Sequence, residues 1–66
     1  MQKSETESKL VISEYYEYAL NDLNNGITID EMNYFVSCFE EEENYLACAG
    51  IKSAINNYTE TIKQKQ

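Results

Sequence analysis

Four consecutive glutamates, Glu40–Glu43, are the densest group of chemically active side chains in the sequence. Carboxylates hold a hard cation such as Ca²⁺ only when they converge on it, and an acid–base pair needs two carboxylates in different environments. Consecutive residues of a helix or turn instead point in diverging directions. The run therefore predicts neither a metal site nor a general acid–base pair, and no cofactor is expected.

The two cysteines, Cys38 and Cys48, form a second candidate pair. A helical hairpin centred near residues 42 and 43 would place them at similar height on facing helices. Free cysteines are often buried, which favours two small apolar side chains in the core, and a redox-sensing pair is the alternative. A catalytic thiol is not expected, because the sequence contains no His and neither cysteine has a basic residue directly beside it.

The segment 24–27 (Asn-Asn-Gly-Ile) invites comparison with a calcium-binding EF-hand loop. With Gly26 at loop position six, Leu23 takes position three and Met32 takes position twelve, and neither side chain can coordinate calcium. Helix capping explains these residues better. The absence of His, Arg and a Gly-rich loop from the sequence also argues against an enzyme.

The distribution of charge is more informative than the net charge of −7. No Lys or Arg occurs between Leu10 and Ile51, and lysines stand only near the two ends of the chain. A body this acidic repels phosphate backbones and anionic lipid, so direct binding to nucleic acid or to a membrane is not expected. The acidic surface either serves solubility or docks on a basic protein.

The chain of 66 residues is expected to form a single helical domain over residues 1–66. No apolar run reaches the length of a membrane span, and the first residues are polar and acidic. These features predict a cytoplasmic protein with reduced cysteines. A domain this small has a thin stability margin, so tight packing, self-association or a partner is expected to add stability.

The sequence contains no Pro and only two Gly, which indicates long helices. A first helix is expected over residues 5–25, opened by a capping box at Ser4–Glu7 and closed by Gly26 in the left-handed conformation. Apolar residues follow one another at helical spacing along this segment. They are Ile12, Tyr15, Tyr16, Ala19, Leu20 and Leu23.

A second helix is expected over residues 28–40. Thr28 and Glu31 form a capping box, and Ile27 and Met32 are placed for a hydrophobic staple. The side expected to be buried carries Ile29, Met32, Phe35, Val36 and Phe39. Residues 40–44 form either a turn or a continuous helix, and the turn is favoured because the apolar stripe does not continue in phase.

A third helix is expected over residues 44–63. Its apolar residues recur at steps of three and four, as in a coiled-coil seam. They are Cys48, Ile51, Ile55, Tyr58 and Ile62, and small residues that permit close helix approach flank them at Ala47, Ala49, Gly50 and Ala54. The predicted fold class is all-α, a small three-helix protein whose second and third helices form an antiparallel hairpin.

Part of the third helix resembles the second half of the UVR motif, a short helical hairpin of excision-repair proteins. The resemblance rests on Glu43, Tyr45, Cys48, Ala49, Ile51 and Ile55, and it extends over residues 32–58. The sequence departs from the motif at Lys52-Ser53, where the family has Arg-Asp, and at Glu40, where a small residue is expected. The resemblance implies docking on another protein in DNA metabolism, without catalysis, as in small phage accessory proteins that work beside helicases.

The leading hypothesis is therefore a non-enzymatic acidic adaptor, or accessory protein, that binds a basic protein surface such as that of a helicase or another nucleic-acid enzyme. Alternatives are an inhibitor whose carboxylates imitate nucleic acid and a structural homodimer. Tyr residues are enriched at protein interfaces, and adjacent tyrosines of one helix cannot all face one core. The candidate partner-binding residues are Glu14, Glu17, Tyr18, Tyr34, Glu40, Glu41, Glu42 and Glu43.

Overall fold

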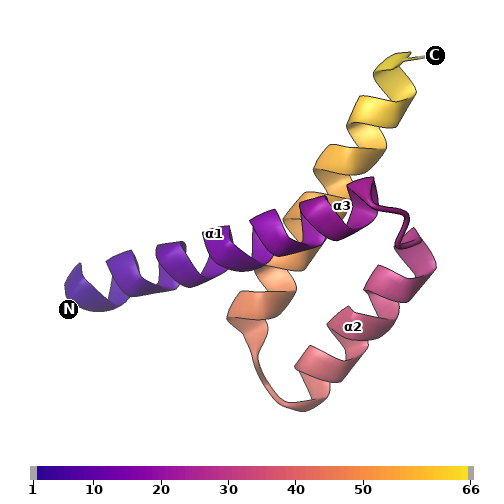
Figure 1. Cartoon of the computed structure of the whole chain (residues 1–66). Coiled ribbons are helices and arrows are strands. Elements are labelled where there is room, and N and C mark those ends of the chain that lie inside the picture. The colour runs from indigo at the N-terminus through magenta and orange to yellow at the C-terminus, as the bar shows by residue number, and fades with distance from the viewer. Residues whose placement is uncertain (1, 66) are drawn as a thin grey trace.

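The computed structural model describes the backbone of residues 2–65 and the side chains of residues 7–63. It contains α1 (Gln2–Asn24), α2 (Ile29–Glu41) and α3 (Tyr45–Lys65), with no strand in the described residues (Figure 1). The all-α, three-helix fold class is confirmed. α1 begins before the residue expected to cap it, and the side chains of the expected capping box at Ser4–Glu7 fall largely outside the described ones.

α1 ends in a Schellman motif, in which a left-handed residue lets two amides bond back to the last turn of the helix. The Gly26 N–H donates to the Leu23 carbonyl at 3.2 Å, and the Ile27 N–H donates to the Asp22 carbonyl at 3.0 Å. Gly26 has φ +112°, a conformation that side chains with a Cβ rarely adopt. The expected closure of the helix by Gly26 is confirmed.

α2 begins with the expected capping box. The Glu31 N–H donates to Thr28 Oγ1 at 3.1 Å, and the Thr28 N–H donates to Glu31 Oε1 at 2.9 Å. Two of the amides that a helix start leaves without intrahelical partners are thereby satisfied. Met32 is buried, and Ile27 packs against the same core from the other side of the cap.

α2 ends in a second Schellman motif, so residues 42–44 form the turn rather than a continuous helix. The Glu43 N–H donates to the Glu40 carbonyl at 3.0 Å, and the Asn44 N–H donates to the Phe39 carbonyl at 2.8 Å. Glu43 takes the left-handed position with φ +62°, where α1 has a glycine. Asn44 Oδ1 then accepts from the Ala47 N–H at 3.3 Å, which caps the start of α3.

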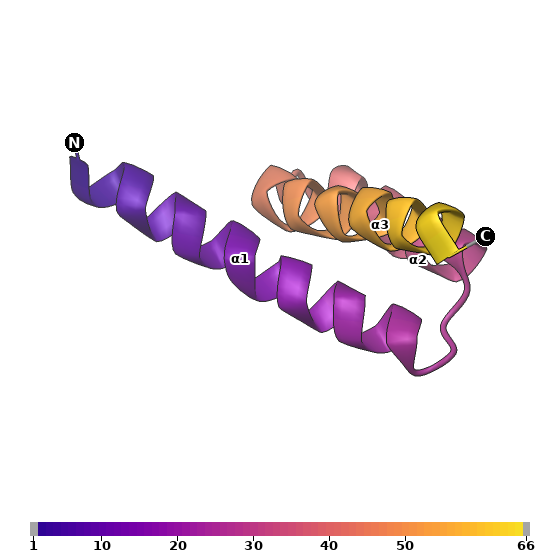
Figure 2. The same ribbon diagram turned by 90° about the horizontal axis from the view of Figure 1, so that it is seen from above.

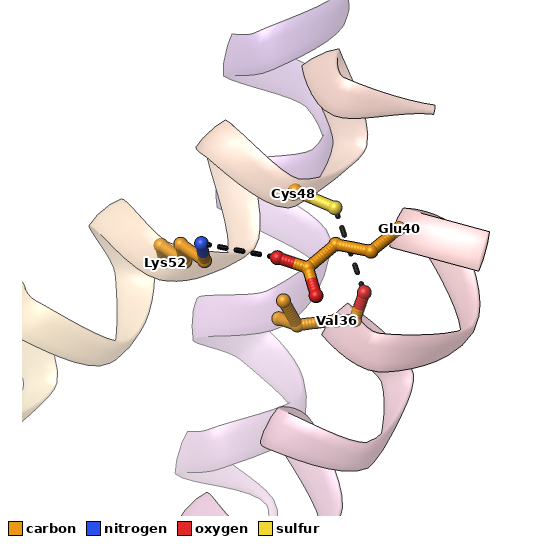
Figure 3. Close-up of polar contacts among 4 residues, drawn as sticks. All are labelled: Val36, Glu40, Cys48 and Lys52. Atoms are coloured by element: carbon orange, nitrogen blue, oxygen red, sulfur yellow. Dashed lines mark hydrogen bonds and ion pairs between the residues drawn. The ribbon is translucent and has the colours of Figure 1, made fainter. Parts of the chain in front are cut away.

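α2 and α3 run in opposite directions on the two sides of this turn, in agreement with a hairpin (Figure 1). Figure 3 shows two polar contacts between them. The Cys48 thiol donates to the Val36 carbonyl at 3.5 Å, and Lys52 Nζ lies 3.4 Å from Glu40 Oε2. Cys48 is buried, Cys38 is half-buried, and both are free thiols.

α1 lies in its own layer across the hairpin and packs on α3 more extensively than α2 does (Figure 2). The close approach is centred on Gly50, which is buried beneath the α1 backbone at Ile12 and Tyr16. Asn57 of α3 also donates a hydrogen bond to the Tyr16 hydroxyl. The small residues of the third helix do permit close approach, and the neighbour they admit is mainly α1.

The core lies where the three helices meet. Its buried apolar members are Ala19, Leu23, Met32, Val36, Ala47, Cys48, Ile51 and Ala54. Three expectations on individual residues were wrong. Ala49 is exposed because the face of α3 that meets α1 is centred on Gly50 and Ala54, and Phe35 and Ile62 are each 40% exposed. Ile55 is half-buried and packs against the core, as expected.

Candidate functional site

An apolar hollow of about 230 Å³ lies between α1 and α2 and is closed at its base by α3. We call it the aromatic groove. Its lining residues are Tyr15, Tyr18, Ala19 and Asp22 of α1, Met32, Phe35 and Phe39 of α2, and Ile51 of α3. α1 and α2 make few contacts with each other compared with those each makes with α3, so they leave this space between them.

The aromatic side chains of the groove are ordered by contacts with one another. The Tyr15 and Phe39 rings are 5.6 Å apart at 72°, which joins the two walls, and the Tyr15 and Tyr18 rings are 6.3 Å apart at 82°. Both are edge-to-face arrangements, the favourable geometry for aromatic pairs. Tyr18 and Phe35 nevertheless keep 64% and 40% of their surface exposed. The groove therefore offers pre-positioned rings that still have surface to bury.

The groove and its rims carry only negative charge among the described side chains. Asp22 is the one charged residue in the lining. Exposed Glu14 lies four residues before Tyr18, and exposed Glu31 lies four residues before Phe35, so each shares a helix face with a ring of the groove. Glu42 follows Phe39 by three residues at the end of α2. None of the described lysines lines the groove.

The structure separates the predicted partner-binding residues into several places. Tyr18 lines the groove, and exposed Glu14 and Glu42 each lie one helical turn from one of its rings. Tyr34 is 66% exposed beside Phe35, with ring centroids 6.2 Å apart, and so lies next to the groove rather than in it.

The remaining predicted glutamates do not gather at the groove. Glu17 is exposed on α1, one residue away from Tyr18 and therefore turned about 100° from it. Glu40 is drawn toward α3 by Lys52. Glu41 and Glu43 are exposed at the end of α2 and in the turn that follows it.

Sequence reasoning missed Phe35 and Asp22 as groove residues. Phe35 was expected in the core because it belongs to the apolar side of its helix. A usable signal was present, however: Met32, Val36 and Phe39 already fill the face toward the core, and Phe35 extends the apolar arc sideways toward α1.

A second hollow, of about 370 Å³, surrounds the loop between α1 and α2. Its lining includes Gly26, Ile27, Thr28 and Tyr58. Helix termination and capping already account for the first three, so this hollow is a consequence of the chain reversal.

Side chains that could ligate a metal ion do not cluster within the part of the chain that the structure describes. No group of three or more Cys, Asp or Glu residues is placed there to hold a metal ion. The pKa of Glu31 is lowered because its carboxylate accepts hydrogen bonds from the Thr28 backbone and hydroxyl. This shift belongs to the helix cap.

Comparison of the chain with protein-family models, with curated proteins and with solved structures finds no match. The resemblance of residues 32–58 to the UVR hairpin therefore stays a prediction from the residues alone. Within the described residues, no helix is long and apolar enough to span a lipid bilayer.

Proposed function

We propose that this protein is a non-enzymatic acidic adaptor that binds another protein through the aromatic groove. The observation that supports this most directly is the exposure of Tyr18 and Phe35 on opposite walls of one apolar hollow. Aromatic side chains are enriched at the buried centres of protein interfaces. Rings held in place by neighbours lose little freedom on binding, which favours affinity.

The expected partner presents a basic surface, because the body of this chain from Leu10 to Ile51 contains no cation. Opposite charges speed the encounter of two proteins and make its rate sensitive to salt. The resemblance of residues 32–58 to the UVR hairpin supports a partner among the proteins of DNA metabolism, such as a helicase. The same proposal places the adaptor in the cytoplasm.

The test is affinity capture from the source cell with three baits: the unaltered chain, Tyr18→Ala and Tyr45→Ala. Tyr45 is the matched control, because it is also 64% exposed but does not line the groove. Proteins retained by the unaltered chain and by Tyr45→Ala, but lost with Tyr18→Ala, support an adaptor that uses the groove. If the three baits retain the same proteins, the groove is not the binding site.

A further inference from the structure

The size of the aromatic groove limits what can fill it. Its volume of about 230 Å³ lies below the roughly 300–1,000 Å³ of ordinary small-molecule sites. It exceeds the roughly 150 Å³ of an engineered cavity that accepts benzene. The space therefore suits one large apolar side chain, or two smaller ones, delivered by a partner whose other contacts lie outside the groove.

The walls of the groove favour a helical partner. Both are α-helices, and the described residues contain no strand whose edge could pair with an extended peptide. A helix laid along two helices can insert an anchor side chain between them while its flanks remain near both rims. An extended segment would find no strand edge here with which its backbone N–H and carbonyl groups could pair.

The negative charge near the groove indicates which residues flank the anchor side chain in the partner helix. Asp22 lines the groove, Glu14 and Glu31 each lie one helical turn before one of its rings, and Lys52 pairs with Glu40. A second copy of this chain would bring another net charge of −7 against the same surface. Lys or Arg residues on either side of an apolar anchor would instead meet carboxylates on both walls.

We infer that the groove receives a basic amphipathic helix of another protein, with a Leu or Phe side chain as the anchor. This inference rests on the proposed adaptor function and specifies the chemistry of its partner. The anchor packs against Tyr18 and Phe35, while Lys or Arg residues one turn before and after it face Glu14, Asp22 and Glu31. Phe39 and Ile51 form the base against which the tip of the anchor rests.

The probe is a synthetic Lys/Leu amphipathic peptide of about four helical turns, titrated into the isotopically labelled full chain. Amide chemical shifts locate the site, and their dependence on concentration gives Kd. Three matched peptides accompany it: a scrambled sequence with the same charge, a version with the anchor Leu replaced by Ala, and a version with Glu in place of Lys. Sedimentation of the chain alone reports self-association.

We expect shift changes centred on Tyr18, Phe35 and Ile51. Removal of the anchor, Tyr18→Ala or Phe35→Ala each weakens binding about tenfold or more, whereas Tyr45→Ala leaves Kd unchanged. Equal binding of the scrambled peptide would overturn the inference, because charge alone would then suffice. A stable dimer whose interface covers the groove would also overturn it, by making a second copy the occupant.

Failure of this inference can be told apart from failure of the adaptor proposal. If the basic peptides do not enter the groove while protein capture still depends on Tyr18, the adaptor stands and the assigned occupant is wrong. If neither capture nor peptide binding depends on Tyr18, both proposals fail.

Discussion

A Cβ atom at Gly50 would lie only 2.5 Å from the carbonyl oxygen of Ile12, so α3 meets the backbone of α1 at this residue with no room for a side chain. The same atom would lie 2.9 Å from the backbone nitrogen of Tyr16. Such separations are closer than packed atoms tolerate. Gly50 therefore sets the spacing between the first and third helices.

Gly50→Ala is expected to destabilise the protein although alanine is the better helix former. The intrinsic preference favours Ala by about 1 kcal/mol. Overpacking costs about 1–3 kcal/mol, and the upper part of that range applies because the opposing atoms belong to backbone that cannot rotate away. Urea unfolding is expected to show a net loss of about 1–2 kcal/mol. Ser53→Ala, at an exposed position of the same helix, is the control and should be neutral or slightly stabilising.

Glu43→Gly is expected to raise stability. Glu43 holds φ +62° at the position that Gly26 occupies in the other Schellman motif. The left-handed conformation costs a residue with a Cβ about 1–2 kcal/mol, and the greater freedom of unfolded glycine offsets part of the relief. We expect a gain of about 0.5–1 kcal/mol in thermal or urea unfolding.

Two control substitutions, one beside Glu43 and one in the other Schellman motif, test the explanation. Glu42→Gly removes the same charge but occupies a right-handed position with φ −84°, so it should give no gain. Gly26→Ala should lose about 1 kcal/mol through backbone strain alone, since nothing lies within 4 Å of the added Cβ. An equal gain from Glu42→Gly and Glu43→Gly would point to relief of charge repulsion instead.

Thr28→Ala is expected to cost about 1 kcal/mol, because the capping box loses the hydroxyl that accepts from the Glu31 amide. Thr28→Ser keeps the acceptor and should retain most of the stability. Urea unfolding of the two variants makes the comparison. Equal losses would mean that the methyl group of Thr28, rather than its hydroxyl, supports the helix start.

The same cap predicts a pH dependence. Hydrogen bonds from Thr28 lower the pKa of the Glu31 carboxyl in the folded protein. The resulting stabilisation is therefore complete above the unfolded pKa of this glutamate and is lost as the pH falls through the lowered, folded pKa. Carboxyl NMR titration should show the Glu31 midpoint rising only part of the way toward its ordinary value in Thr28→Ala, because this variant loses the hydroxyl donor but keeps the backbone N–H that donates to Glu31 Oε1. An unchanged midpoint would assign the lowered pKa to the backbone hydrogen bond alone.

The local features of the fold were predictable from the sequence because they depend on neighbouring residues. The capping box of Thr28 and Glu31 and the stop at Gly26 need only residues within one turn. The turn after Glu41 followed from the loss of phase in the apolar stripe. The start of α1 at Gln2, against an expected start near residue 5, shows that a good local cap does not prevent a helix from beginning earlier.

The packing of the helices could not be predicted to the same depth. Small residues on the third helix predicted that another helix packs closely on it, but they did not indicate which one. In the structure that helix is mainly α1. The aromatic groove arises from the angle between α1 and α2, and no periodicity within one helix encodes that angle. Phe35 illustrates the limit, since its helical spacing from Met32 and Phe39 fits the core, yet it forms a wall of the groove.

The burial of α3 gives the most severe test of the fold. Ala54 has no exposed surface, whereas Ile55 is half-buried and a carboxylate there could reach water. Ala54→Asp buries an unpaired charge and is expected to abolish cooperative folding of a domain with so small a core. Ile55→Asp should be less damaging. Ala49→Asp makes the same chemical change at an exposed position of the same helix and should keep the helical circular dichroism. If Ala49→Asp unfolds the chain and Ala54→Asp does not, α3 presents the opposite face to α1, and the groove closed by Ile51 would not exist in this form.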